Sequence, residues 1–235
     1  MGLFDIFIPK RSITDSGILK GSTDRHSHIL YGVDDGIKTL EDSLAVLAFE
    51  ESLGLKEVWC TPHIMEDVPN TTESLRARFD ELCSHYTGPI KLRLAAEYMI
   101  DTVFEKRLEA GDLLTMEDSM LLMETSTIAP PYDLKGSLKD AMSSGYCPLF
   151  AHPERCRYLE VKDCEELVEM GVRLQLNIAS LTGYYGQSTR AKAETLLKKG
   201  LYFAYGSDCH RVRTVKEQYN RPELKKDIIQ KLKNI

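Results

Sequence analysis

Short apolar runs and longer amphipathic stretches follow one another along the chain in a regular order. The apolar runs are rich in β-branched and aromatic residues, as strands are. They occupy residues 57–64, 90–98, 119–126, 147–155, 172–180 and 201–210. Helix-like patterns lie between them, over residues 39–53, 72–86, 134–144, 162–170 and 189–199. Several of these patterns end at a glycine, where a helix C-cap is expected. Strands that alternate with helices predict an α/β fold with a parallel sheet.

The polar residues of these runs gather at the C-terminal ends. A seventh run of the same form, "TDRHSHIL", begins at Thr23. The imidazoles and carboxylates at or just after the run ends are His26, His28, His63, Glu97, Glu124, His152, Asp208 and His210. A closed barrel collects its chemistry at that edge, because all of its strands open on one mouth. An open doubly wound sheet binds ligands there only near its switch point. Seven contributing strands therefore favour a closed barrel.

Length and composition are consistent with one large domain. The chain has 235 residues, of which 43% are hydrophobic and 28% charged, as in ordinary globular proteins. We divide it into an N-terminal extension, residues 1–22, and a single barrel, residues 23–235. The final stretch, residues 221–235, is expected to form an amphipathic helix with a solvated lysine-rich face.

The charge pattern and hydropathy exclude several classes of partner. A net charge of −6, with no basic stripe, argues against nucleic acid. A phosphate-bearing substrate would therefore need a locally positive site. No apolar run approaches the ~20 residues of a membrane span, and the N-terminal segment lacks the order of a secretory signal. We expect a cytoplasmic protein.

The cysteines do not form a recognisable reactive or structural pattern. The six of them are scattered, with no CxxC pair, which argues against a thiolate zinc site. None has an arginine six positions later, the spacing that cysteine-dependent phosphatases need. A GxSxG nucleophile elbow and a GxxxxGK[ST] phosphate loop are also absent from the sequence.

The segment "DRHSHILYGVDDG", residues 24–36, places two histidines one residue apart. A period of two puts both imidazoles on one face of a strand, which suits one metal ion or two structural histidines equally. Five of the six histidines lie at predicted strand ends, and this clustering favours ligands. The exception, His85, falls in a helical stretch and is interpreted as structural. We expect Asp24 to hydrogen-bond an imidazole and fix its tautomer.

The candidate ligands combine imidazole with carboxylate. Such sites hold manganese, iron or zinc in catalytic roles, and Cys209 is the one thiol flanked by candidate ligands. About eight ligands are too many for one ion, so two or three ions sharing a bridging carboxylate are predicted. Sites of this kind catalyse phosphoryl hydrolysis.

Two further residues at strand ends have more than one interpretation. Arg155, in "AHPERCR", offers a planar fork that binds phosphate through two hydrogen bonds; alternatively it pairs with Glu154 at the surface. Glu124 follows three apolar residues, so we expect it to lie in the barrel mouth, where a raised pKa would suit a general acid. Its alternative roles are a metal ligand or a partner of Arg155.

Six motifs, in order across residues 24–213, resemble one family. They are "DRHSHILYGVDDGIKT", "TPHI", "AAEYMID", "AHPER", "LQLNIASLTGYYG" and "GSDCH". The sequence is similar to the PHP-type bacterial protein-tyrosine phosphatases of capsule and exopolysaccharide synthesis, the CpsB/YwqE group. This resemblance implies a distorted, TIM-like barrel of seven β/α units and a three-metal site that often holds manganese or iron. It also implies a phosphotyrosine-bearing protein as substrate, the tyrosine-rich tail of a bacterial tyrosine kinase.

The same resemblance assigns roles position by position. It gives the metal ligands as His26, His28, Asp35, His63, Glu97, His152, Asp208 and His210, with Glu97 bridging. Asp35 is preferred to Asp34 because the family's ligand precedes glycine. Arg155 matches the phosphate-binding arginine and Glu124 matches a glutamate that assists proton transfer.

Two positions depart from the family's pattern. Met99 stands where many members carry arginine, and the family's second arginine has Arg213 and Arg211 as its nearest candidates. These departures concern substrate preference rather than the metal site.

The leading interpretation is a metal-dependent protein-tyrosine phosphatase that holds two or three divalent ions, manganese first, with iron or zinc as alternatives. Another PHP-type phosphoesterase, acting on histidinol phosphate or a nucleotide, is an alternative that the "LTGYYG" and "DDG" segments disfavour. A catalytically silent metal-binding module that docks on a partner is a third hypothesis, and the full ligand set argues against it.

Overall fold

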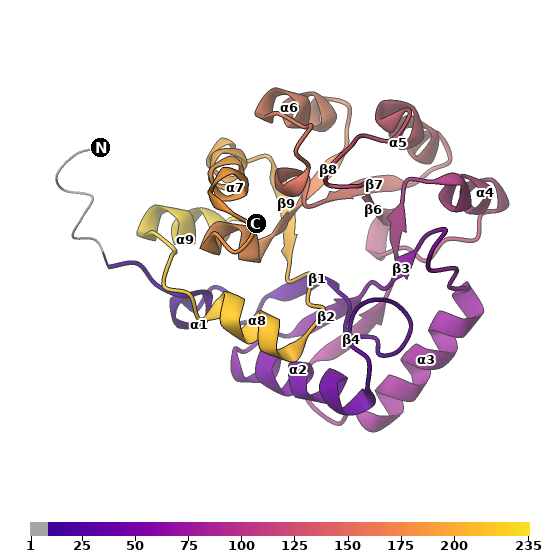
Figure 1. Ribbon diagram of the computed structural model, residues 1–235. Helices are drawn as coiled ribbons and strands as arrows, with labels where there is room; N and C mark the ends of the chain where they lie inside the picture. The colour runs from indigo at the N-terminus through magenta and orange to yellow at the C-terminus, as the bar shows by residue number, and fades with distance from the viewer. Residues whose placement is uncertain (1–8) are drawn as a thin grey trace.

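The strands of the computed structural model, which describes residues 9–235, form two parallel sheets (Figure 1). The first sheet has the order β1 (Thr23–Ser27), β2 (Glu57–Cys60), β4 (Lys91–Leu94). The order of the second sheet is β3 (His63–Ile64), β5 (Glu97–Met99), β6 (Met120–Glu124), β7 (Cys147–Ala151), β8 (Arg173–Asn177), β9 (Tyr202–Gly206). Every strand pair is parallel, which confirms the predicted alternation of strand and helix.

Two of the predicted runs are each divided into two short strands. The run 57–64 breaks after Cys60, where Pro62 lacks an N–H group, and the run 90–98 breaks at the Ala95–Ala96 pair. Backbone hydrogen bonds cross both breaks: Ala95 N donates to Cys60 O at 3.0 Å, and Glu97 N donates to Pro62 O at 3.1 Å. The two sheets are therefore joined through the chain and through these bonds.

The last strand of the second sheet also meets the first strand of the first sheet. Ser27 and Cys209 form a parallel bridge, and Asp208 N donates to His26 O at 2.7 Å. The close approach depends on Gly206, because a Cβ atom there would lie 2.4 Å from the Cβ of His26.

Helices surround the strands (Figure 1). They are α1 (Ile13–Ser16), α2 (Leu40–Ser52), α3 (Thr72–His85), α4 (Thr102–Ala110), α5 (Leu134–Ser143), α6 (Val161–Glu169), α7 (Gln187–Lys199), α8 (Val212–Tyr219) and α9 (Lys226–Leu232). Short 3₁₀ segments lie at Glu117–Ser119, Pro153–Arg155 and Ile178–Thr182. The five predicted internal helices are confirmed to within two residues at each end, and the expected C-terminal helix corresponds to α9. Helices α4 and α8 were not predicted; both are short, and α4 buries a single residue, Phe104.

The described part of the N-terminal segment, residues 9–22, packs against the C-terminal segment. Ile13, Ile18 and Leu19 are buried in the core, and Arg11 pairs with Leu224 in an antiparallel bridge. The division between an extension, residues 1–22, and a barrel stays a prediction, and residues 1–8 lie outside the described residues. No helix in the described range is long and apolar enough to cross a bilayer.

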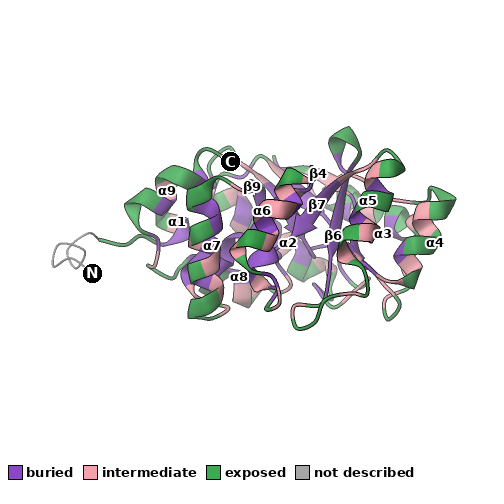
Figure 2. Cartoon of the chain, turned by 90° about the horizontal axis from the view of Figure 1, so that it is seen from above, coloured by how far each residue is buried: buried purple, intermediate pink, exposed green. Residues whose placement is uncertain are grey.

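Side chains on the two faces of the strands enter two different apolar clusters. In β6, Leu121 and Met123 belong to the large cluster that contains the buried residues of the helices. Met120 and Leu122 belong to a second, smaller cluster. The second cluster comprises Trp59, Ala95, Met116, Met120, Leu122, Leu149 and Ala151. Buried residues line the interior and exposed residues cover the outer faces of the helices (Figure 2). Because side chains alternate, Glu124 lies on the same face as this second cluster.

Candidate metal centre

The strand ends bring the predicted polar residues together. His26 lies in β1, His63 begins β3, Glu97 begins β5 and Glu124 ends β6. The other members follow strands directly: His28 after β1, His152 after β7, Asp208 and His210 after β9. The structure therefore places these residues at one edge of the sheets.

Glu97 stands at the centre of this cluster. Its Oε2 atom lies 3.1 Å from Nε2 of His26, 3.1 Å from Nε2 of His28 and 3.2 Å from Nδ1 of His63. Its Oε1 atom lies 3.3 Å from Nε2 of His152. Burial opposes ionisation of Glu97, but the surrounding imidazoles outweigh burial and hold its pKa well below the usual range.

Asp208 forms a second contact point with the same imidazoles. Its Oδ1 atom lies 3.5 Å from Nε2 of His26 and 3.4 Å from Nε2 of His28. Asp208 and His152 both adopt left-handed backbone conformations, with φ of 51° and 36°. Such conformations cost free energy in residues other than glycine and cluster at functional sites.

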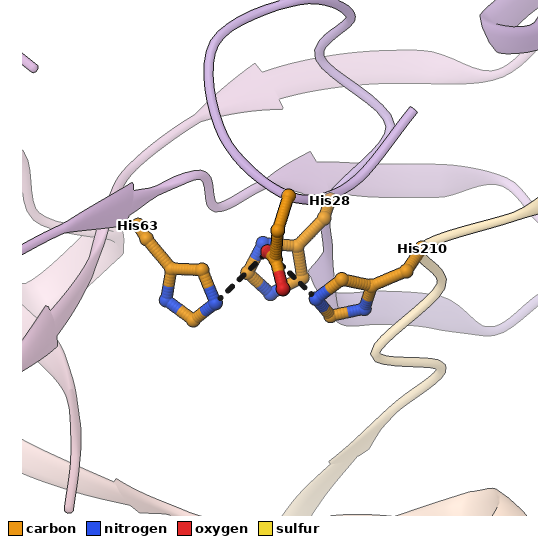
Figure 3. Close-up of side chains that lie close together, drawn as sticks. His28, His63 and His210 are labelled. Atoms are coloured by element: carbon orange, nitrogen blue, oxygen red, sulfur yellow. Dashed lines mark ion pairs between the residues drawn. The ribbon is translucent and has the colours of Figure 1, made fainter. Parts of the chain in front are cut away.

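Asp35 approaches the cluster from the loop after β1. Its Oδ1 atom lies 3.5 Å from Nε2 of His63 and 3.3 Å from Nε2 of His210. Dashed lines join this carboxylate to the rings of His63 and His210, and the ring of His28 lies beside them (Figure 3). The side chain of Asp35 is 69% exposed, so this part of the cluster opens to solvent. The hydrogen bond to His210 lowers the pKa of Asp35 despite partial burial.

The donor set fits divalent metal ions. Four groups of side chains each bring three or more ligand atoms within 4.8 Å of one another. These groups are His28, Asp35, His63 and His210; His26, His28 and Asp208; His26, Glu97 and His152; and His63, Glu97 and Glu124. Cys209 is buried and its thiol belongs to none of them.

Several buried ligand atoms lack a hydrogen-bond partner among residues 9–235. They are both carboxylate oxygens of Glu97, Oε1 of Glu124, Nδ1 of His63 and Nδ1 of His152. The oxygens of Glu97 lie close to imidazole nitrogens, yet the geometry of these contacts is not that of hydrogen bonds. Buried polar atoms without partners are costly, and coordination of a cation would satisfy those that lie within the ligand groups.

The imidazoles are held by residues outside the predicted ligand set. Gln175 Oε1 lies 3.0 Å from Nδ1 of His26, and Asp34 Oδ2 lies 2.8 Å from Nδ1 of His28. These contacts leave Nε2 of each ring turned toward Glu97, which is how supporting groups orient metal ligands. Gln175 was not singled out from the sequence, although a buried polar residue inside an apolar strand was the available signal.

The expected role of Asp24 is wrong. Its Oδ1 atom accepts hydrogen bonds from the backbone N–H groups of His26 and Ser207, and it bonds no imidazole. The register of β1 shifts between Asp24 and Ser27. Burial raises the pKa of Glu50, and the charge of Asp24 raises it further.

Arg155 lies beside the cluster, with a side chain that is 25% exposed. Its Nη1 atom lies 2.5 Å from Oδ2 of Asp208, and its guanidinium stacks 4.4 Å from the ring centre of Tyr185. The alternative pairing with Glu154 is wrong, because Glu154 is 1% exposed and accepts hydrogen bonds from Asn177 N, Ser180 Oγ and Tyr202 OH.

Glu124 and Arg213 occupy contrasting positions. Glu124 is buried, with Oε1 3.0 Å from Nδ1 of His63 and Oε2 3.7 Å from Nε2 of His152. This position is compatible with a ligand and with a proton donor. Arg213 lies on α8 with a side chain that is 90% exposed, and it pairs with Glu217 at 2.7 Å. The structure does not bring Arg213 into the cluster.

Comparisons with known proteins agree with this geometry. Residues 22–232 match the model of the family described as "Capsular polysaccharide synthesis, CpsB/CapC". The tyrosine-protein phosphatase YwqE of Bacillus subtilis is 29% identical over 198 residues, covering 81% of this chain and 78% of that protein. The tyrosine-protein phosphatase CpsB of Streptococcus pneumoniae is 29% identical over 201 residues, covering 80% of this chain and 82% of that protein.

A solved structure is also similar. It comes from a study of YwqE and CpsB, described as unique metal-dependent tyrosine phosphatases. It superposes with a TM-score of 0.74 at 29% identity, over 82% of this chain and 81% of that one.

Proposed function

The chain belongs to the CpsB/CapC family of capsular polysaccharide synthesis, and we propose that it is a metal-dependent phosphatase that hydrolyses phosphotyrosine in protein. The observation that carries this proposal is the buried carboxylate of Glu97, surrounded by four imidazoles, with the guanidinium of Arg155 beside the same cluster. Imidazoles and carboxylates hold the metal, and the arginine supplies the charge and shape that phosphate requires.

The arrangement of the strands supports a closed barrel of the PHP type. The breaks at Pro62 and at Ala95–Ala96 leave seven strand units, and the bridge between Ser27 and Cys209 joins the last unit to the first. Closure would explain why ligands from β1 and from the end of β9 meet over Glu97.

Two or three divalent ions fit the four overlapping ligand groups, with manganese first and iron or zinc as alternatives. Such ions supply Lewis acidity, which activates water and neutralises phosphoryl charge. His26, His28, His63, His152, His210, Asp35, Glu97 and Asp208 would hold them.

The remaining residues act on the phosphate ester. Arg155 donates hydrogen bonds to phosphoryl oxygens, and the ring of Tyr185 keeps the guanidinium plane oriented. Water adds to phosphorus as the P–O bond to the phenolate breaks, and Glu124 delivers a proton to the departing phenolate, which yields tyrosine and inorganic phosphate. Arg213 is proposed as a further cation for the substrate; it would first have to release Glu217.

The proposed partner is a phosphotyrosine-bearing protein, the tail of a bacterial tyrosine kinase, met in the cytoplasm. The similarity to the tyrosine-protein phosphatases YwqE and CpsB supports a substrate of this kind. The acidic net charge of −6 supports the absence of nucleic acid among the partners.

Hydrolysis of a phosphotyrosine peptide, with and without chelator, tests the function. We expect phosphate release to stop on exhaustive chelation and to return on addition of single ions, which also identifies the preferred metal. Full activity after chelation would overturn metal dependence. Faster turnover of histidinol phosphate or a phosphodiester would favour the other phosphoesterases, and tight binding without phosphate release would favour a silent module.

A further inference from the structure

A surface cavity of about 530 Å³ adjoins the metal cluster, between the Pro153–Arg155 turn, the start of α6 and the first half of α7. Its size falls in the range of small-ligand sites. Arg155 and Tyr185 form part of its wall, whereas none of the proposed metal ligands does. Because Arg155 also contacts Asp208, the cavity and the cluster share one arginine.

Cationic side chains line the cavity, and they differ in whether their charged groups already form hydrogen bonds within the protein. Lys192 donates to the backbone oxygens of Cys156 at 2.6 Å and Leu159 at 2.7 Å, so it holds the turn that carries Arg155. Arg157 is exposed, and its backbone N–H donates to Thr127 O. Its guanidinium forms no ion pair or hydrogen bond with any residue from 9 to 235. Arg157 is therefore the cation that is free to meet a ligand.

The two carboxylates of the cavity wall do not cancel this charge. Glu154 is turned inward, and three donors occupy its oxygens. Glu160 is exposed at the N-terminus of α6, where a helix favours an acid. Three basic side chains thus face one exposed carboxylate, in a protein of net charge −6.

We propose that this cavity binds an anionic side chain that neighbours the phosphotyrosine of the substrate, either a carboxylate or a second phosphate. This inference rests on the proposed function, because Arg155 places the reacting phosphate at the cavity's rim. An extended peptide advances about 3.3–3.6 Å per residue, so a side chain within a few residues of the phosphotyrosine reaches Arg157. The enzyme would therefore select phosphotyrosines in acidic or multiply phosphorylated segments.

Peptides of equal length with one phosphotyrosine provide the test. In one series every flanking residue is glutamine and single positions are changed to glutamate. In a second series the same positions carry tyrosine or phosphotyrosine. We expect kcat/KM to rise about tenfold at one or two positions, mainly through KM, which corresponds to about 1.4 kcal/mol of binding. The two series show whether carboxylate or phosphate is preferred.

The variant Arg157→Gln should abolish this preference while turnover of free phosphotyrosine and of the all-glutamine peptide stays unchanged. Arg76→Gln, at an exposed arginine of α3 outside this cavity, is the matched control and should keep the preference. Arg157→Glu should reverse it, so that lysine at the same position becomes favourable. The preference of the unaltered enzyme should weaken as salt is added.

Equal kcat/KM for all peptides of both series would overturn the inference and leave the phosphatase intact. A preference that survives both Arg157→Gln and Arg157→Glu would overturn it as well. Absence of turnover of free phosphotyrosine and of every peptide, in the presence of metal, would overturn the proposed function itself, and the inference with it.

Discussion

The two halves of the strands carry opposite chemistry on the same face. Toward the N-terminal ends, this face packs into an apolar cluster that includes Trp59, Leu122 and Leu149. Toward the C-terminal ends it presents imidazoles and carboxylates, gathered around Glu97. Both halves are almost fully buried.

A single strand shows the difference most clearly. In β6, Met120 and Leu122 belong to the apolar cluster, and Glu124, two residues on, lies among the proposed ligands. Burial of an apolar side chain is favourable wherever it occurs. Burial of a carboxylate is tolerated only where cations or donors compensate it. The apolar half therefore stabilises the fold, and the polar half depends on its ligand.

The largest effect on the polar half is expected when its central carboxylate is removed. We expect Glu97→Gln to lose metal and to lower kcat/KM by more than about 10²-fold, since even residues that only orient ligands cost 10–100-fold. Metal analysis and peptide hydrolysis measure both effects, and His26→Ala should behave alike. Glu117→Gln, at an exposed carboxylate, is the control. A Glu97→Gln variant with full metal content would contradict the central role of Glu97.

Truncation of a side chain in the apolar half should lower the stability of the protein and leave metal binding unchanged. Leu149 is fully buried, so Leu149→Ala should lower the free energy of unfolding by about 2–5 kcal/mol. Metal content per folded molecule should not change. Denaturant titration in the presence of metal measures the loss. A variant of normal stability but reduced metal content would show that the two halves are not separable.

Replacement of Arg155 should impair catalysis alone. We expect Arg155→Ala to lower kcat/KM about 10²–10³-fold, as when a donor to transition-state charge is removed. Metal content and stability should stay near normal. Arg155→Lys should restore only part of the rate, because an ammonium lacks the planar fork. Near-normal kcat/KM in Arg155→Ala would make Arg213 or Arg211 the candidate.

Metal removal should make the stability of the protein depend on pH, through the imidazoles of the polar half. In the metal-free protein burial disfavours protonated His26, but Glu97 and Asp208 outweigh burial and raise its pKa to about 9. The pKa in the unfolded chain is about 6.5. The stabilisation is therefore complete below about pH 6.5 and is lost as pH rises through about 9, amounting to about 3 kcal/mol at most.

Thermal or chemical unfolding of chelated protein between pH 6 and 10 measures this decline. Metal-loaded protein should lack it, because ligation already requires neutral imidazole. In the metal-free His26→Gln variant the loss should be smaller but not absent, because, against the effect of burial, Asp208, Asp34 and Glu97 also raise the pKa of His28. An equal alkaline loss in that variant would assign the effect to another group.

The smallest effect is expected at a residue that only orients a ligand. Gln175 contacts Nδ1 of His26, so Gln175→Leu should weaken metal affinity or activity about 10–100-fold without abolishing either. Metal titration measures the change. An unchanged affinity would show that the backbone alone fixes the orientation of His26.

The sequence by itself determined the order of strands and helices, the parallel pairing and the face on which the polar residues gather. These properties follow from local periodicity and from the position of each polar residue relative to its own strand. For this reason His63, Glu97, Glu124 and His152 could be placed at the strand ends before any contact was known.

Only the tertiary structure decided which atoms meet. Gln175 lies 149 positions from the histidine that it orients, and no local pattern encodes such a pairing. The register of β1 shifts between Asp24 and Ser27, and Asp24 bonds backbone N–H groups rather than an imidazole, an outcome that a regular period of two does not predict. Arg155 was available to Glu154 by sequence distance, but burial of Glu154 among three donors left it to Asp208. Packing between distant segments sets these contacts, because it determines which polar groups lose water and must find partners.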